Sequence, residues 1–206
     1  MKETADKKKQ NNTEKPLKAI GRGKAIFIVI LCIILAVFVG GRRGLMNERK
    51  EALSYFTGEN YKGGQNNNHS EKDCVRYYID ERLSCANNLI TLASYYIPND
   101  SLVKNVKSEI DDLIDNDNPS SCYKHNEKLT AACNSLFAKL KNVIPEGDEY
   151  LVYAQGQIDK MVSAQQKMGH LEYNVKAETF NKLISRFPTD LVSRFTFVRA
   201  LPLFTD

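Results

Sequence analysis

The sequence predicts an all-α protein in which a single N-terminal transmembrane helix is followed by an up-and-down four-helix bundle. Three observations lead to this prediction. Residues 25–41 contain no charged side chain. From residue 71 onward, apolar side chains recur every three or four residues, as they do on the buried face of a helix. Turns at Pro98, Pro119 and Pro145 divide this part of the chain into four segments, and helices joined by short turns pack well as an up-and-down bundle.

The apolar run at residues 25–41 is predicted to cross a membrane. At about 1.5 Å per residue, a helix of this length nearly spans the hydrocarbon core of a bilayer. An uncleaved anchor is favoured over a cleaved signal peptide. The apolar region of a signal peptide is usually about 7–15 residues long, and residues 39–41 match a cleavage site poorly.

The flanking charges predict the orientation of this helix. Residues 1–24 contain eight Lys or Arg and three Asp or Glu, and they are too polar to fold, so we expect a basic disordered tail. Short segments rich in Lys and Arg remain cytoplasmic, so the N-terminus is expected in the cytoplasm and the C-terminal domain outside the cell membrane. The tail suits contact with anionic lipids of the bilayer. Residues 42–206 carry 21 basic and 22 acidic side chains, which argues against nucleic-acid binding.

The part outside the membrane divides into a connection and a helical domain. Residues 42–70 are expected to form a stalk, which continues the membrane helix, and a flexible loop rich in Gly and Asn. Residues 71–206 are expected to form the bundle. Its four predicted helices cover about residues 71–97, 101–114, 120–144 and 148–186, the third opening at Ser120 or Ser121. Arg82 interrupts the apolar stripe of the first, and the repeat of the fourth slips by one residue between Met168 and Tyr173.

The C-terminal part carries a specific motif. Its residues are Tyr173-Asn174, Phe180-Asn181, Ile184 and Phe187-Pro188, followed by Leu191, Phe197, Pro202 and Phe204. Two weaker matches lie upstream, namely Arg82-x5-Asn88-Leu89-Ile90-x4-Tyr95 and Leu129-x3-Cys133-x2-Leu136. With the N-terminal anchor, these residues make nearly the whole chain resemble the LemA family of bacterial membrane proteins.

The resemblance implies a single anchor followed by a four-helix bundle, and no established enzymatic activity. The chain departs from the family pattern at several points. Phe180 replaces the second Tyr of the repeated Tyr-Asn pair, Asn87 stands where the family tends to have Pro, and the usual Trp is absent.

The asparagines of the motif also have a physical interpretation. Asn174 and Asn181 are seven residues apart and therefore lie on one helix face beside the apolar stripe. Because buried amides need hydrogen-bond partners, we expect both to bond a neighbouring helix or the C-terminal tail.

The residues capable of catalysis or metal binding form no convincing site, so no catalytic, cofactor or metal site is predicted. His125 and Glu127, and likewise His170 and Glu172, are two residues apart, which does not direct both side chains of a helix at one target. The paired cysteines that accompany His-x-Glu in zinc deaminases are missing. The acidic run 109–117 lacks the Gly and terminal Glu of a calcium loop. We therefore expect no enzyme, no cofactor and no small-molecule substrate.

Four cysteines outside the membrane are candidates for disulfide bonds: Cys74, Cys85, Cys122 and Cys133. Each pair is eleven residues apart, about 16 Å along a helix, which is too far for a disulfide within one helix. A bridge must therefore join the first helix to the third, and the compartment permits oxidation. One solution pairs 74 with 133 and 85 with 122, and the other pairs 74 with 122 and 85 with 133. The bridge between Cys85 and Cys122 is favoured, with four free core cysteines as the alternative.

The apolar C-terminal tail, residues 190–206, has two interpretations. Its aromatic side chains either fold back over the membrane end of the bundle or, with Arg194 and Arg199, lie on a lipid surface. The whole pattern favours a non-enzymatic scaffold or interaction protein of the bacterial envelope, whose partners are the lipid bilayer and other envelope proteins. The alternative is an accessory subunit of a membrane protease or of an envelope-stress system.

Overall fold

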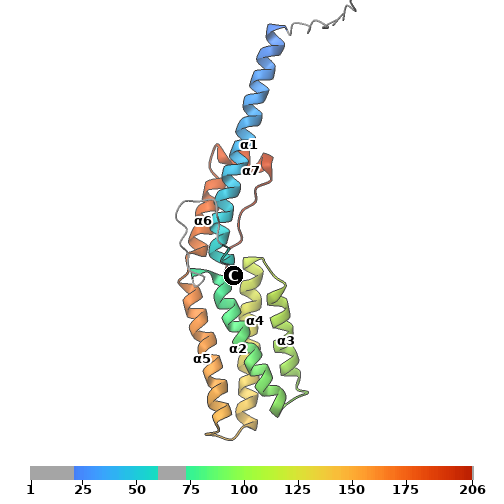
Figure 1. The fold of residues 1–206 in the computed structure, drawn as a ribbon, viewed down its shortest axis with the longest axis vertical. Helices are drawn as coiled ribbons and strands as arrows, with labels where there is room; N and C mark the ends of the chain where they lie inside the picture. The colour runs from blue at the N-terminus through green and yellow to red at the C-terminus, as the bar shows by residue number, and fades with distance from the viewer. Residues whose placement is uncertain (1–20, 60–72, 206) are drawn as a thin grey trace, which may run out of the picture. The chain divides into compact units, whose positions relative to one another are not determined.

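The computed structural model describes residues 21–59 and 73–205, and every regular element within these ranges is a helix (Figure 1). The predicted all-α class is therefore confirmed. The helices are α1 (Arg22–Thr57), α2 (Val75–Tyr96), α3 (Ser101–Ile114), α4 (Pro119–Val143), α5 (Glu149–Gly169), α6 (Tyr173–Ile184) and α7 (Thr189–Thr196). The chain divides into two compact units, residues 1–37 and 38–206.

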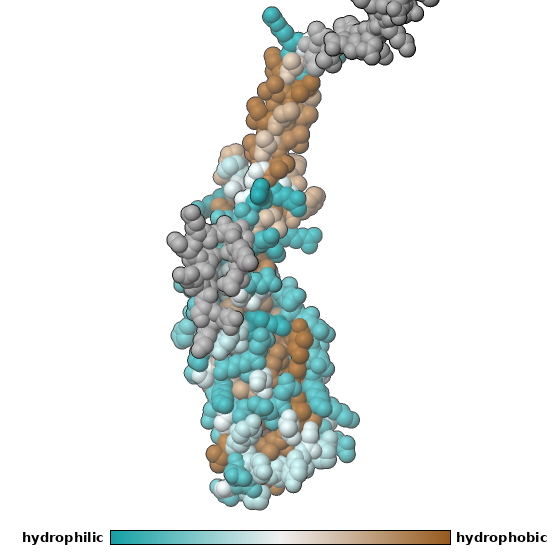
Figure 2. All heavy atoms as spheres, viewed as in Figure 1, coloured by the Kyte–Doolittle hydropathy of each residue, from teal (hydrophilic) through white to brown (hydrophobic). Residues whose placement is uncertain are grey.

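The first unit contains the apolar part of α1. Among the described residues, α1 is the one helix that is long and apolar enough to span a membrane, and its apolar window is not buried. Figure 2 shows this part of the chain as an almost continuous hydrophobic surface. The basic tail predicted at residues 1–20 lies outside the described residues.

The second unit begins with the remainder of α1, residues 38–57. The predicted stalk belongs to this part of the chain. Here the helix has buried side chains, so it is part of a packed core. The Phe56 ring lies 5.3 Å from the Tyr173 ring and 6.0 Å from the Phe204 ring, centroid to centroid. Gly58 follows the helix with a φ of +76°, and a Cβ atom there would lie 2.7 Å from the Cys74 Sγ, so the end of α1 adjoins the start of α2. The flexible loop expected up to residue 70 lies mostly outside the described residues.

Helices α2, α3, α4 and α5 pack on one another around a shared core. Helix α2 contacts α3, α4 and α5, and α4 contacts α3 and α5. The most deeply buried apolar side chains come from all four helices: Val75, Ile79, Ala86, Leu89, Ala93, Val106, Leu113, Leu129, Leu136, Leu140 and Ala154. On the face seen in Figure 2, the surface over these helices is mainly hydrophilic.

Contacts along α2 show the directions of its neighbours. The Arg76 guanidinium donates to the carbonyl of Asn116, just before α4, and Arg82, farther along α2, donates to the carbonyl of Asn126, farther along α4. Helices α2 and α4 therefore run parallel. Arg82 also reaches Met161 of α5, whereas the later Asn88 bonds the earlier Gln157, so α2 and α5 run antiparallel.

Polar side chains cap the starts of three helices. Asp100 accepts a hydrogen bond from the Leu102 amide, and Asp148 accepts one from the Tyr150 amide. Asn118 caps α4, so the following proline is the first residue of this helix and does not precede it. The third helix was predicted to open at Ser120 or Ser121, and it begins slightly earlier.

The prediction of one long fourth helix over residues 148–186 is wrong. The structure has two helices, α5 and α6, separated at residues 170–172. The break falls where the apolar repeat slips between Met168 and Tyr173. Helix α5 packs on α2 and α4, whereas α6 lies beside α1, where the Lys176 ammonium is 5.0 Å from the centre of the Tyr55 ring. The two halves therefore bury different partners.

Candidate functional site

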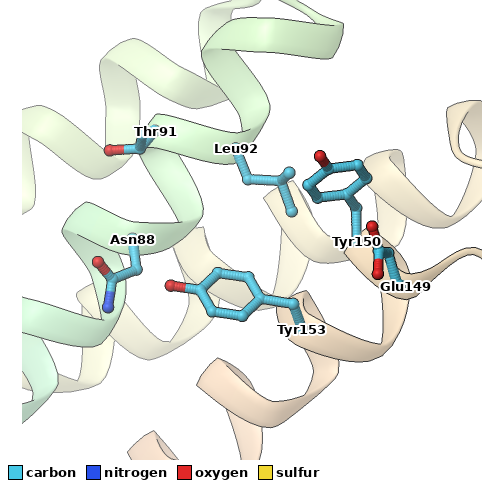
Figure 3. A pocket seen from close by; sticks show the side chains of 6 residues that line it. All are labelled: Asn88, Thr91, Leu92, Glu149, Tyr150 and Tyr153. Atoms are coloured by element: carbon cyan, nitrogen blue, oxygen red, sulfur yellow. The ribbon is translucent and has the colours of Figure 1, made fainter.

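An open groove of about 490 Å³ lies between α2 and α5. Its lining comes from the last turns of α2 and the first turns of α5: Asn88, Thr91, Leu92, Glu149, Tyr150 and Tyr153 (Figure 3). The Tyr153 ring extends from α5 towards α2, and its hydroxyl is directed to the side where Asn88 and Thr91 lie. Leu92 provides an apolar floor between the two tyrosines. The groove thus joins flat aromatic faces to a few polar groups.

More tyrosines surround this groove. The rings of Tyr95 and Tyr96 are 5.1 Å apart, and the ring of Tyr96 is 6.2 Å from that of Tyr150. Tyr95 is 80 % exposed, and Tyr150 and Tyr153 are each 48 % exposed. Partial burial and the nearby carboxylate of Asp148 raise the pKa of Tyr96 above its ordinary value. The result is an exposed aromatic surface on a mainly polar set of helices.

A second polar site lies inside the core, around Arg82. Its side chain is fully buried, and its two terminal nitrogens hold α2 against α4 and α5. Nη1 donates to the Met161 carbonyl at 2.9 Å and to the Gln165 Oε1 at 3.0 Å. Nη2 donates to the Asn126 carbonyl at 3.3 Å and to the Thr130 hydroxyl. All four acceptors are uncharged, and burial lowers the pKa of Arg82.

A smaller cavity of about 160 Å³ adjoins this arginine. Glu127 lies at its rim and accepts a hydrogen bond from the Gln165 amide at 3.1 Å. Two buried polar atoms, Arg82 Nε and Asn126 Oδ1, have no hydrogen-bond partner among the described residues. Because four of the five guanidinium donors are used by helix carbonyls and side chains, the arginine mainly links helices.

The two asparagines of the C-terminal motif bond the tail and not a neighbouring helix. Asn181 Nδ2 donates to the Leu201 carbonyl at 2.8 Å, and the Leu201 amide donates back to Asn181 Oδ1 at 2.7 Å. Asn174 forms the same reciprocal pair with Phe204, at 3.1 and 2.8 Å. The Tyr173 hydroxyl donates to the Pro202 carbonyl at 2.6 Å. The motif therefore holds an extended segment of chain against α6.

The remaining motif residues have divided roles. Tyr173 and Phe180 are buried, so they contribute to the core. Phe187 is 82 % exposed, and Pro188 immediately precedes α7. After α6, Phe187 and Phe197 of the motif thus face outward, whereas Phe204 is buried.

The predicted bridge between Cys85 and Cys122 is wrong. Cys85, Cys122 and Cys133 are free thiols, so none of the four pairings between the two helices forms. Cys122 lies in the first turn of α4, level with the start of α2, where its thiol donates to the Asn116 carbonyl at 2.8 Å. Cys133 is the cysteine of α4 that lies near Arg82 and Cys85. The predicted bridge requires Cys122 to lie level with Cys85, whereas Cys122 lies near Arg76, at the start of α2.

Buried thiols make the stability of the protein sensitive to alkaline pH. Burial raises the pKa of Cys133 from 9.0 to about 12, and the thiols of Cys85 and Cys122 shift in the same direction. Between pH 9 and 12 the unfolded state therefore binds fewer protons than the folded state. We expect the free energy of unfolding to fall by up to about 1.4 kcal/mol per pH unit through Cys133 alone. Denaturant unfolding at a series of pH values between 9 and 12 measures this fall in the free energy of unfolding. In Cys133→Ala the free energy of unfolding should fall less steeply with pH. Equal slopes for the two proteins would contradict the expectation.

His125 and Glu127 do not form a joint site. His125 Nδ1 is 3.1 Å from Glu109 Oε2 on α3, whereas Glu127 bonds Gln165 on α5. Glu109, Asp112 and His125 bring three ligand-type atoms within 4.8 Å of one another. The hydrogen bond between the imidazole and the carboxylate accounts for this arrangement.

Sequence reasoning missed the groove and the importance of Arg82. The signal for Arg82 was present, because an arginine in the middle of an apolar stripe must find buried acceptors. The groove is not marked by a sequence motif, since its lining residues belong to two helices far apart in the chain. Comparison with protein-family models, curated proteins and solved structures finds no match for this chain.

Proposed function

We propose that this chain is a membrane-anchored interaction protein of the bacterial envelope with a LemA-like build and no enzymatic activity. The LemA likeness is supported by the role of its motif, in which Tyr173, Asn174 and Asn181 all bond the closing segment of the chain. In this proposal α2–α5 form an up-and-down four-helix bundle. The parallel pair α2 and α4 and the antiparallel pair α2 and α5 support that arrangement.

The observation that carries the proposal is the tyrosine-lined groove. Tyrosine is enriched at the centres of protein–protein interfaces, because it offers a large rigid surface with a polar tip. The lining contains one carboxylate, Glu149, and no acid–base pair or activated nucleophile. This chemistry suits an apolar side chain of a partner protein, flanked by a basic group that meets Glu149.

The position of the groove fits a membrane-anchored binder. It occupies the end of α2 that is remote from α1, about 20–26 Å along the helix from Val75. A partner bound there would contact the domain away from its connection to the anchor. The anchor then restricts the search for membrane-associated partners to the region near the bilayer.

Photo-crosslinking in intact cells tests the proposed site. A photoreactive residue placed at Tyr153 is expected to capture a specific protein, identified by mass spectrometry, at least about tenfold more than one placed at Ser135, an exposed position of α4 outside the groove. Recovery of a membrane protease would specify the partner and favour the accessory-subunit role. Equal, unspecific capture at the two positions would contradict the proposed groove.

The proposed orientation, with the N-terminus in the cytoplasm, predicts a labelling pattern. Ser108→Cys introduces an exposed thiol on α3. Lys8→Cys introduces a thiol in the N-terminal sequence rich in lysine. We expect an impermeant thiol reagent to label intact cells at position 108 and not at position 8. The wild-type chain is the blank, because Cys74, Cys85, Cys122 and Cys133 are buried and Cys32 lies within the apolar run, which this orientation places in the lipid. Labelling at position 8 alone would show the inverted orientation.

A further inference from the structure

We propose that α7 and the segment following it form a second membrane contact, which lies on the bilayer surface where α1 leaves the lipid. The proposal rests on the membrane anchor of the proposed function, and it assigns a ligand, the lipid interface, to a surface of residues 187–197. We call this surface the aromatic patch. Its exposed apolar side chains are Phe187, Leu191, Phe195 and Phe197.

The aromatic patch is unusually apolar for a solvent-exposed surface. Phe187 is 82 % exposed, Phe195 is 67 % exposed and Phe197 is 85 % exposed. The large exposed area of these three phenylalanines is not explained by packing, because the buried side chains of this region are those of other residues. Val192, Val198 and Leu201 are the buried apolar side chains of residues 187–201.

The position of α7 indicates what covers the patch. Helix α7 packs on the residues of α1 that end the apolar run. The Phe195 ring is 5.2 Å from the Phe38 ring, in an edge-to-face arrangement. A Cβ atom on Gly41 would lie 2.9 Å from Val192 Cγ1, so α7 approaches the helix backbone closely at this point. Because Arg42 and Arg43 follow directly, the run ends where the hydrocarbon meets the headgroups.

The charges around the patch match an anionic lipid surface. Residues 186–199 contain Arg186, Arg194 and Arg199 against a single acidic residue, Asp190. Arg194 bonds Asp190 at 2.8 Å and remains 76 % exposed at its side chain. Aromatic side chains with nearby cations are typical of segments that lie in the interface of a bilayer. The patch therefore combines apolar insertion with attraction to headgroups.

The two earlier interpretations of the tail thus apply to different residues. The last part folds back, since Leu201 and Phe204 are buried and held by Asn181 and Asn174. The part before it faces outward. The change occurs at Phe197, whose φ of +56° turns the chain at the end of α7. The same motif therefore fixes one half of the tail to the protein and presents the other half to lipid.

Tryptophan fluorescence tests the proposal, because the chain contains no tryptophan of its own. The full chain is reconstituted in vesicles of phosphatidylglycerol and phosphatidylcholine that carry bromine near the headgroup end of the acyl chains. Single variants Phe195→Trp and Phe197→Trp report on the patch. Leu35→Trp, in the apolar run, reports on insertion of the anchor, and Tyr153→Trp, in the groove, reports on water-exposed surface.

We expect bromolipid to quench Phe195→Trp and Phe197→Trp several-fold more than Tyr153→Trp, with a blue-shifted emission. Quenching of Leu35→Trp alone would overturn the patch proposal and leave the anchor in place. No quenching at Leu35→Trp would overturn the anchor and the patch together. A blue shift at Phe197→Trp without quenching would show that protein covers the patch, which also contradicts the proposal.

Discussion

Replacing Arg82 by alanine is expected to lower the free energy of unfolding by about 3 to 5 kcal/mol. The variant loses four hydrogen bonds between α2 and its neighbours α4 and α5, and it leaves an enlarged cavity in the core. Denaturant unfolding of the full chain in detergent, followed by circular dichroism, measures the change. A loss below about 1 kcal/mol would show that the arginine does not link the three helices.

Methionine at position 82 separates the contribution of the hydrogen bonds from that of packing. Arg82→Met fills most of the volume and brings no charge. The acceptors retain other donors, since Thr130 also bonds the Asn126 carbonyl and the Asn126 amide also bonds Gln165 Oε1. We therefore expect Arg82→Met to lose clearly less stability than Arg82→Ala. Equal losses of stability in the two variants would contradict this expectation and would show that the hydrogen bonds of Arg82, and not its packing, provide the stability.

Replacing Asn181 by alanine is expected to release the C-terminal tail and to lower the free energy of unfolding by about 2 to 4 kcal/mol. The amide makes two hydrogen bonds to Leu201, and its loss leaves the peptide N–H and C=O of that residue without partners. Arg199, two residues earlier, then becomes a better site for trypsin. We expect cleavage there to accelerate at least about tenfold, because local opening of the tail costs less free energy.

Asn87 provides the matched control for this variant. Within residues 21–59 and 73–205, its amide donates to the Leu83 carbonyl, four residues earlier in the same helix. Asn87→Ala should leave stability within about 0.5 kcal/mol of the wild type, because alanine favours the helix and no tail contact is lost. Tail cleavage that is equally rapid in both variants would contradict the role of the motif.

The local order of the helices was readable from the sequence. Turn residues and apolar spacing placed the boundaries of α2 and α3 within a few residues, and Asp100 and Asp148 stand at the helix starts. The slip between Met168 and Tyr173 was visible as well, but its consequence was not. A slip of one residue can be absorbed by a long helix or can end it. Which of the two occurs depends on whether the helical segments before and after the slip bury their apolar stripes against the same helices.

The tertiary features were less accessible, for a common physical reason. The predicted bridge between Cys85 and Cys122 was wrong because a spacing of eleven residues fixes only the distance between two cysteines of one helix. It does not fix how far one helix is shifted along the other. The groove depends on Leu92 and Tyr153, which lie on different helices and share no pattern in the chain. The Asn pair was informative because a buried amide beside an apolar stripe requires a partner, and the tail provided it.

Binding of the crosslinked partner to the full chain in lipid nanodiscs tests the central claim most directly. Tyr153→Ala removes the ring that spans the groove, and a hot-spot tyrosine at an interface is expected to weaken binding by about 30-fold or more. Ile114→Ala is the control, since this side chain is 51 % exposed at the other end of the helices. The account predicts a large loss of affinity for Tyr153→Ala and wild-type affinity for Ile114→Ala. Wild-type affinity in both variants would contradict it.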